Sequence, residues 1–285
     1  MKNMKGKRVI ITGPTSGIGR EIATQLSVSG ADLVLACRNL ERGRRVAEEI
    51  SKNSGITSII DVMFLDTSCI QSIFKFSEAY KKQFSNLDVL VNNAGVNRAE
   101  QPLEDSVDGI ELTFATNVLG YYLLTRELLD MLNAATPSRI VNVASTFASD
   151  LDLGDVQFKR RPYNGMKAYS QSKACDRLIT WAFARRLEKS GVTANAMAPG
   201  LVPTSNLFSK MSSETQNMLK QRGGADPAQG ADTAVWLASN TEVEHINGKF
   251  FEQRKEIACE FRNNENEEKL WDICEGMINQ FSPKV

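Results

Sequence analysis

Five short apolar runs, each followed by a polar stretch long enough for a helix, constrain the fold of this chain more than any other feature. They cover residues 7–12, 33–37, 59–65, 89–91 and 140–143. Strands that are apolar along their whole length are buried on both faces, as in parallel sheets whose strands are joined by helices. Right-handed crossovers place those helices on both sides of the sheet. The sequence therefore predicts a doubly wound parallel sheet with three α/β/α layers.

The first apolar run leads directly into a glycine-rich turn. Its residues are Gly13-Pro14-Thr15-Ser16-Gly17-Ile18-Gly19, and an amphipathic stretch follows. This order predicts a strand, a tight turn and a helix. Glycine permits close approaches that a Cβ would forbid, so free amides at the start of the helix can meet a diphosphate. The GxxxGxG spacing fits neither the GxGxxG dinucleotide fingerprint nor the GxxxxGK(S/T) phosphate loop, so a turn without a ligand stays open on this segment alone.

Residues suited to ligand binding lie where these five strands end and after a sixth strand expected before Pro199. They are Gly13, Arg38, Asp66, Asn92, Ser145 and Pro199. In a doubly wound sheet the ligand binds outside the carboxyl ends of the strands. The sequence therefore predicts that these residues share one site.

Tyr169 and Lys173 are four positions apart, so on a helix they share one face. A lysine cation about 5 Å from a tyrosine oxygen favours the phenolate by roughly 3 kcal/mol at an effective dielectric constant of about 20. The spacing predicts a tyrosine pKa lowered toward neutral, where a general acid or base works best. For an isolated Tyr-x-x-x-Lys the alternative is a helical tyrosine beside a solvated lysine.

Together the motifs resemble those of the short-chain dehydrogenase/reductase family. The matching residues, in the family's order, are Thr12-Gly13-x-x-x-Gly17-x-Gly19, Asn92-Asn93-Ala94-Gly95, Asn117, Ser145, Tyr169-x-x-x-Lys173 and Pro199-Gly200. Within this family, the chain most resembles the retinol-dehydrogenase and WW-domain-oxidoreductase-like branch. The segments that carry this likeness are Ala36-Cys37-Arg38-Asn39, residues 150–167, residues 247–251 and residues 269–271. The resemblance implies a Rossmann fold and hydride transfer between a nicotinamide cofactor and a carbonyl/alcohol pair.

The resemblance also implies four catalytic residues. Tyr169 would exchange a proton with the carbonyl or alcohol oxygen, and Ser145 would hydrogen-bond that oxygen as charge develops on it. Lys173 would lower the pKa of Tyr169 and hydrogen-bond the nicotinamide ribose, while Asn117 would hold a water that links Lys173 to solvent. A mid-helix asparagine facing solvent is the alternative for Asn117, and a strand-end serine bonded to backbone is the alternative for Ser145.

The same resemblance implies the cofactor contacts, each group following a different predicted strand. The turn that binds the diphosphate would consist of Gly13, Ser16, Gly17, Ile18 and Gly19. Asp66 and Thr67 would flank the adenine, and the adenosine ribose would be covered by Asn92, Asn93, Ala94 and Gly95. The nicotinamide amide would contact Pro199, Gly200 and Thr204. We therefore expect a dinucleotide lying across the carboxyl ends of the strands.

Arg38 decides the expected form of the cofactor. It lies 19 positions after Gly19 at the end of the second apolar run, where an acidic residue would bind the ribose diol of NAD and repel a 2′-phosphate. An arginine can instead hold a phosphate through a planar two-pronged contact. The sequence therefore predicts NADP(H) as the cofactor. The alternative is that Arg38 is only part of a solvated basic face with nearby arginines.

Charge and cysteine pattern limit the partners. The 285 residues include 34 Lys plus Arg and 34 Asp plus Glu, so no net field attracts nucleic acid or an anionic membrane. Five scattered cysteines without CxxC spacing indicate free thiols in a reducing compartment, and we expect a cytoplasmic protein. We expect no membrane span, because no run reaches about 18 apolar residues, and the opening residues lack a signal-peptide pattern.

His245 is the only histidine, which limits the possible chemistry. No metal cluster can be built around it, and we expect it at the surface. A Ser-His-Asp hydrolase would need it as the base and would also need a GxSxG elbow, which is absent. The sequence therefore predicts a small-molecule enzyme without a metal.

Residues 1–285 are expected to form one NAD(P)-binding domain. Within it, residues 201–225 mix methionine and leucine with polar residues and fit a mobile lid over a hydrophobic or mixed carbonyl substrate, with ordinary surface helices as the alternative. Residues 255–285 are expected to be a helical tail that packs. The apolar stretch 174–183, after Lys173, offers more surface than one helix face can bury, which favours a homodimer.

Two other functions stay open. A non-catalytic dinucleotide-binding regulator could share the fold, although the set of Asn117, Ser145, Tyr169 and Lys173 disfavours it. A nucleotide-sugar epimerase also uses Tyr-x-x-x-Lys, but it usually needs a longer chain with a substrate domain after the sheet. A turnover assay with carbonyl compounds separates these functions.

Overall fold

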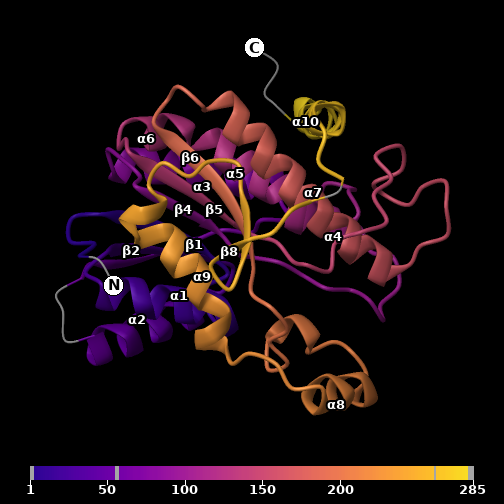
Figure 1. The fold of residues 1–285 in the computed structure, drawn as a ribbon, viewed down its shortest axis with the longest axis horizontal. Helices are drawn as coiled ribbons and strands as arrows, with labels where there is room; N and C mark the ends of the chain where they lie inside the picture. Colours follow the sequence, from indigo (N-terminus) through magenta and orange to yellow (C-terminus); the bar gives the residue numbers. More distant parts are fainter. Residues whose placement is uncertain (1–2, 55–57, 260, 282–285) are drawn as a thin grey trace.

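An eight-stranded sheet runs through the middle of the molecule (Figure 1), in the order β3-β2-β1-β4-β5-β6-β7-β8. The structure is a computed structural model that describes residues 3–54, 58–259 and 261–281. The strands are β1 (Arg8–Thr12), β2 (Asp32–Cys37), β3 (Ile60–Phe64), β4 (Val89–Asn92), β5 (Ser138–Val143), β6 (Val192–Ala198), β7 (Phe250–Glu252) and β8 (Lys255–Glu256). All neighbouring strands pair in parallel except β7 and β8. The doubly wound parallel sheet is confirmed.

Helices cover both faces of the sheet. One face packs against α1 (Gly17–Val28), α2 (Leu40–Ser54) and α9 (Pro227–Ser239), and the other against α3 (Ile70–Gln83), α5 (Gly120–Glu127) and α7 (Gly165–Arg186). Ile10 of β1 belongs to one core, and its neighbours Val9 and Ile11 belong to the other. This alternation explains why the strands are apolar along their whole length.

The remaining elements are short, apart from the C-terminal helix described below. They are α4 (Leu112–Phe114), the π-helix η1 (Ala115–Leu119), α6 (Leu129–Asn133), α8 (Ser213–Gln221) and the 3₁₀ turns η2 (Asn206–Phe208) and η3 (Thr241–Val243). Among the described residues, no helix is both long and apolar enough to cross a membrane.

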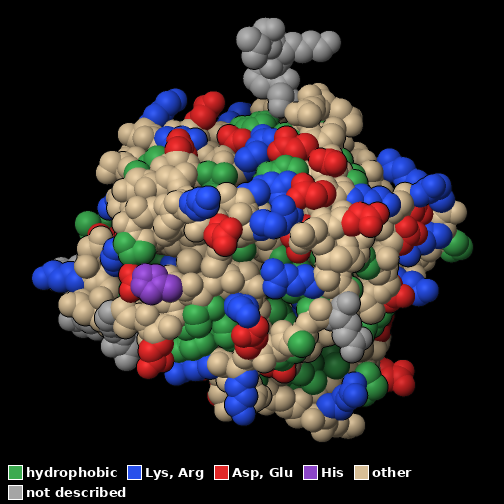
Figure 2. Space-filling model, turned by 45° about the horizontal axis from the view of Figure 1, so that its top comes forward, with side chains coloured by type: hydrophobic (Ala, Val, Ile, Leu, Met, Phe, Trp, Pro, Cys, Tyr) green, Lys and Arg blue, Asp and Glu red, His purple; other side chains and the backbone are tan. Residues whose placement is uncertain are grey.

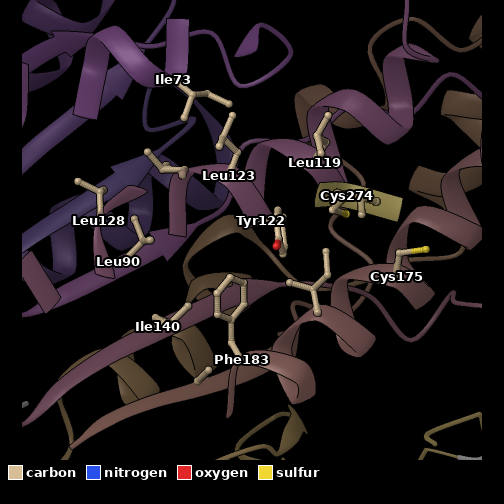
Figure 3. Packing of buried hydrophobic residues seen from close by; sticks show 14 of the residues in the cluster. Ile73, Leu90, Leu119, Tyr122, Leu123, Leu128, Ile140, Cys175, Phe183 and Cys274 are labelled. Carbon is tan, nitrogen blue, oxygen red and sulfur yellow. The ribbon is translucent and has the colours of Figure 1, made fainter. Parts of the chain in front are cut away.

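A C-terminal helix, α10 (Asn264–Asn279), packs on α7 and α5. Trp271 meets the rings of Tyr122 and Phe183 edge to face, with centroids 4.8 and 5.0 Å apart. Cys274 is fully buried in the same cluster as Cys175 of α7, and Figure 3 shows Tyr122 among these side chains. Of the expected tail of residues 255–285, residues 264–279 form this packed helix, whereas residues 255–256 pair with β7 as β8, and residues 260 and 282–285 lie outside the described residues.

The helix α10 covers the apolar surface on which the expectation of a homodimer was based. The apolar residues 174–183 of α7 are all buried within the chain, between the sheet and α10. Arg126 of α5 pairs with both carboxylate oxygens of Glu275, the residue after Cys274, at 3.0 Å, which also holds α10 against α5. The apolar surface that favoured a homodimer is therefore already covered.

The surface carries no large area of one charge sign on the face that Figure 2 shows, where basic and acidic side chains are interspersed. His245 is exposed, as expected. Within the described residues, no group of three His, Cys, Asp or Glu side chains could hold a metal ion.

The packing of α10 can be tested with Leu270, which is fully buried. Leu270→Ala should lower the free energy of unfolding by about 2–5 kcal/mol, because it leaves a cavity against α7. The control is Lys269→Ala at an exposed neighbouring position, which should change stability by less than about 0.5 kcal/mol. Urea unfolding measures both, and equal stability of the two variants would contradict the packing of this helix.

Candidate active site

The glycine turn joins β1 to α1. Gly13 and Gly17 have φ angles of +65° and +53°, which residues with a Cβ rarely adopt. A Cβ at Gly19 would overlap the carbonyl oxygen of Gly13 and the side-chain amide of Asn93. The GxxxGxG spacing is therefore a steric requirement of this turn. The first turn of α1 has no acidic residue, so no carboxylate competes for its free amides.

Thr12 and Asn93 lock this turn to the segment after β4. The Thr12 hydroxyl oxygen accepts hydrogen bonds from the amides of Asn93 at 2.8 Å and Ala94 at 2.9 Å. The Asn93 side chain donates in return to the carbonyl oxygens of Thr12 at 2.8 Å and Gly13 at 3.2 Å. Two segments expected to bind the cofactor are therefore in direct contact.

Asn92 differs from its neighbours because its side chain belongs to the core. It is fully buried and donates to Asn142 Oδ1 at 2.9 Å and Thr125 Oγ1 at 3.0 Å. Asn142 in turn donates to Thr180 of α7 at 2.9 Å. The Asn92 side chain therefore ties β4 to β5 and takes no part in the surface expected to close over the ribose.

Asn117 lies in the π-helix η1, a rare turn that is frequent at functional sites. Its side chain is 0% exposed, so the alternative of a solvent-facing asparagine is wrong. Oδ1 accepts from the Val96 amide at 2.9 Å, and Nδ2 donates to the Val96 carbonyl at 3.0 Å and to Ser172 Oγ at 2.9 Å. Asn117 thus joins the segment after β4, where Gly95 lies against it, to α7.

Ser145, Tyr169 and Lys173 meet at the carboxyl end of β5. Lys173 Nζ donates to the carbonyl oxygen of Val143, the last residue of β5, at 3.0 Å. Ser145 Oγ accepts a hydrogen bond from the Phe147 amide at 3.0 Å and also interacts with the Tyr169 phenol, and the lysine nitrogen lies 5.9 Å from the centre of the tyrosine ring. The expected proximity of these three side chains is therefore present.

The charge balance around Tyr169 differs from the expectation. Burial raises the pKa of Tyr169 above its usual value; Lys173 and the Ser145 hydrogen bond lower it, and the Asp176 carboxylate raises it. Asp176 accepts a hydrogen bond from Lys173 Nζ at 2.8 Å. The prediction that Lys173 lowers the pKa of Tyr169 toward neutral is therefore wrong when only the residues of this chain are considered. The tyrosine is buried, and the charge of the lysine is paired with Asp176.

The two residues expected at the adenine differ in exposure. Asp66 is partly exposed and its carboxylate accepts from the Ser68 amide at 3.0 Å and hydroxyl at 2.7 Å, which shapes the turn after β3. Thr67 is buried, and its carbonyl lies so close to Gly120 that a Cβ there would overlap it. Thr67 therefore supports the start of α5 as well as the site.

Arg38 is exposed directly after β2. Beside this strand end, Thr15, Asn39, Arg42 and Arg45 help to line a surface hollow of about 370 Å³. The hollow joins the glycine turn to the first turns of α2. Glu41 and Glu49 also line this hollow and pair with Arg45 and Arg20.

The segment after β6 forms a long loop whose two ends lie together, because the Ala225 amide donates a hydrogen bond to the Leu201 carbonyl at 2.8 Å. Pro199 is partly buried, and Gly200 and Thr204 are exposed. Ser205 lies near Gly17, with its hydroxyl 3.8 Å from where a Cβ would stand. The expected nicotinamide segment thus comes together with the glycine turn.

The expected lid, residues 201–225, contains η2 and α8, and no residue of α8 is buried. The Glu100 carboxylate, in the loop after β4, accepts from the Thr215 hydroxyl and the Ser212 amide at the start of α8. These hydrogen bonds lower the pKa of Glu100. The segment therefore contains two short helices, and its role as a mobile lid stays a prediction.

A family comparison agrees with this geometry. The model of the short chain dehydrogenase family matches residues 7–216, which include the glycine turn, Ser145, Tyr169 and Lys173. This chain belongs to the short-chain dehydrogenase family. It is therefore an oxidoreductase of a family that binds nicotinamide dinucleotides.

Among curated proteins, the chain is similar to human retinol dehydrogenase 13, with 34% identity over 98% of this chain and 87% of that protein. Human retinol dehydrogenase 14 is 35% identical over 96% and 87% of the two chains. The chicken WW domain-containing oxidoreductase is 32% identical over 98% of this chain and 70% of that protein. These relatives confirm the expected branch of the short-chain dehydrogenase family.

Solved structures share the fold. A Mycobacterium paratuberculosis protein of uncharacterised function superposes with a TM-score of 0.77 at 27% identity, covering 98% of this chain and 96% of that one. A Burkholderia cenocepacia short chain dehydrogenase in complex with NADP has a TM-score of 0.70 at 26% identity, covering 88% and 97%.

The residues of this chain fit a dinucleotide. The glycine turn leaves room at Gly17, where the nearest atom to a built Cβ is 3.8 Å away, and free helix amides lie beside it. Lys173 uses two of its N–H donors within the protein, and an ammonium has three. A donor for a ribose hydroxyl and a cradle for a diphosphate are therefore both present.

Sequence reasoning missed three residues that shape this site: Thr12 as the clamp of the glycine turn, Glu100 as the contact to α8, and Asp176 as the partner of Lys173. Thr12 was part of the matching motif without a role assigned to it, and Asp176 left a signal in its spacing. It lies three positions after Lys173, so a helix places both on one face.

Gly19→Ala tests the close packing of the turn. The added Cβ would push the turn away from Asn93, so we expect the dissociation constant of NADPH to rise at least about tenfold, or about 1.4 kcal/mol. The control is Gly276→Ala in α10, where a Cβ meets nothing within 4 Å. Fluorescence titration with NADPH measures both, and unchanged affinity in Gly19→Ala would contradict the cradle.

Proposed function

We propose that this chain interconverts a carbonyl and an alcohol by hydride transfer with NADP(H), with Tyr169 as general acid and base. The observation that carries the proposal is that the Tyr169 phenol, Ser145 and Lys173 come together at the carboxyl end of β5. Two hydroxyl groups that converge at one point can both contact the oxygen of a substrate. The retinol dehydrogenases among the relatives support a reaction of this class.

Bound NADP(H) would supply or accept the hydride at its nicotinamide ring. The side chains of this chain handle the proton. In reduction, the Tyr169 phenol gives its proton to the carbonyl oxygen, and Ser145 donates a hydrogen bond to that oxygen as charge develops on it. In oxidation, the phenolate takes the proton from the alcohol.

Lys173 and Asn117 hold this arrangement. Lys173 fixes α7 to the end of β5 through the Val143 carbonyl and has an N–H left for the ribose of the cofactor. Asn117 fixes the segment after β4 to α7 through Ser172. We propose that its remaining acceptor capacity holds the water that connects Lys173 to solvent.

We propose NADP(H) over NAD(H) because of the basic strand end at β2. Arg38 is exposed there, and Arg42 lines the neighbouring hollow, where Arg45 is paired with Glu41. Guanidinium groups bind phosphate through charge-assisted hydrogen bonds, so a 2′-phosphate would be stabilised in this place. The neighbour from Burkholderia cenocepacia was solved with NADP.

We propose a hydrophobic or mixed carbonyl substrate. Phe147 is half exposed and stacks on the Tyr169 ring, with centroids 6.4 Å apart. Met166 at the start of α7 and Met218 on α8 are also exposed large apolar side chains. An apolar substrate would bury this surface.

We also propose a reducing, cytoplasmic location. All five cysteines are free thiols, and Cys175 and Cys274 remain unpaired in one buried cluster. Thiols of this kind persist where glutathione keeps them reduced.

A non-catalytic regulator is the second candidate, because burial and Asp176 both disfavour the phenolate that alcohol oxidation needs. It would bind the dinucleotide without turnover. Measured oxidation of NADPH with an aldehyde or ketone decides against it.

Tyr169→Phe removes the proposed proton donor. Activity on a confirmed substrate should fall by about 10² to 10⁴, the range usual for general acid and base groups, while the affinity for NADPH should be largely kept. Tyr80→Phe is the matched control, because it removes a phenol that only donates to the Asn86 carbonyl at 2.8 Å. Parent-like turnover by Tyr169→Phe would reject the assignment.

Arg38→Asp tests the cofactor choice. The parent chain should bind NADPH about ten- to a hundredfold more tightly than NADH, as expected for one charge-assisted pair, and the variant should abolish or reverse this preference. Arg44→Asp, an exposed change on α2, should alter the ratio far less. Equal dissociation constants for both cofactors in the parent chain, at one salt concentration, would rule out the preference.

A substrate panel tests the apolar surface. Hydrophobic aldehydes and ketones should give higher kcat/KM values than phosphorylated or polyanionic carbonyl compounds, because Phe147, Met166 and Met218 expose apolar side chains. The rate of NADPH oxidation measures this. Highest efficiency with a phosphorylated compound would overturn the substrate class.

A further inference from the structure

Asp176 is a fully buried carboxylate on α7, beside Lys173. Its Oδ2 accepts the hydrogen bond from Lys173 Nζ at 2.8 Å. Its Oδ1 is also buried and has no hydrogen-bond partner in the part of the chain that the structure describes. A buried carboxylate oxygen without a donor is unfavourable, so a purely structural role explains this residue poorly.

The groups around Asp176 leave Lys173 as its direct partner. Arg177, the next residue, turns away to stack on Phe250 at 3.7 Å and to donate to the Ser145 carbonyl. The other titratable groups near Asp176 are Tyr169 and Cys175 on α7, Tyr121 on α5 and, beside Cys175, Cys274 on α10. Arg177 is faced by Glu252 of β7 and by Cys259. Burial raises the pKa of Asp176 to about 6, against the opposing effect of Lys173.

Asp176 acts on Tyr169 through Lys173. The lysine cation favours the phenolate, and the carboxylate at 2.8 Å offsets that cation. We propose that Asp176 is a positioning residue that pairs the charge of Lys173, so that Tyr169 keeps its proton at neutral pH and the site favours carbonyl reduction. This inference rests on the proposed role of Tyr169 as general acid and base.

The proposal has a defined proton balance. In reduction, the phenol O–H bond breaks and the substrate O–H bond forms, while the hydride of NADPH forms the new C–H bond; the phenolate then regains a proton from solvent. In oxidation, the phenolate must form before the alcohol loses its proton. A higher phenol pKa therefore extends reduction to higher pH and delays oxidation to higher pH.

Asp176→Asn tests this with pH profiles of kcat/KM in both directions. The rising limb of alcohol oxidation and the falling limb of carbonyl reduction should both move down by about one to two pH units, as expected for loss of one buried charge near the phenol. Below a pH of about 6, where Asp176 carries a proton, the difference should disappear. Active Asp176→Asn protein whose profiles coincide with those of the parent would overturn the proposal.

Asp150→Asn is the matched control. Asp150 is exposed and accepts from Ser170, the residue after Tyr169, at 3.2 Å. Solvent screens its charge, so its removal should leave both profiles in place. Asparagine also tolerates the φ of +56° at this position. A shift as large as that of Asp176→Asn would show a general charge effect and contradict the specific role.

A second measurement needs only the parent chain and Tyr169→Phe. The difference between their tyrosinate absorbance titrations gives the midpoint for Tyr169. A midpoint above that of a free phenol, which is about pH 10, is expected, and a lower midpoint overturns the proposal even if Asp176→Asn does not fold. Full activity of Tyr169→Phe would instead remove the proposed function, which separates the two failures.

Discussion

The hydrogen bond from Lys173 to the Val143 carbonyl fixes the helix that carries Tyr169 against the strand that leads to Ser145. A buried ammonium must be paired, and here a strand end and Asp176 provide the partners. Because α7 is buried by the sheet on one side and α10 on the other, this bond lies in a rigid setting. The positions of the Tyr169 and Ser145 hydroxyl groups therefore depend on this hydrogen bond.

The sequence was sufficient for the architecture. Each apolar run contains a strand, because strands covered on both faces need apolar side chains throughout, and residues at the strand ends could be assigned to one edge. β7 and β8 were not predicted, since strands of 3 and 2 residues carry almost no periodicity. The role of α10 was predicted only as packing, because its partner face on α7 is distant in sequence.

The sequence predicted which side chains come together at the end of β5, but it did not predict their charge pairing or the direction of the Tyr169 pKa shift. Spacing places Tyr169 and Lys173 on one face, but it does not show how deeply the phenol is buried or which carboxylate pairs with the lysine. Asn92 was assigned to the surface with its neighbours, although its side chain turns into the core toward Asn142. These differences arise from burial and side-chain direction, which depend on contacts across the sheet.

Transfer of isotope from the cofactor tests most directly whether this site catalyses hydride transfer. NADPH with deuterium in place of the transferable hydrogen on C4 would be incubated with hydrophobic aldehydes and ketones, and the products analysed by mass spectrometry. The parent chain should form an alcohol with one deuterium on the former carbonyl carbon. A parent chain that binds NADPH and yields no labelled alcohol with any of them would contradict the catalytic account and favour a regulator.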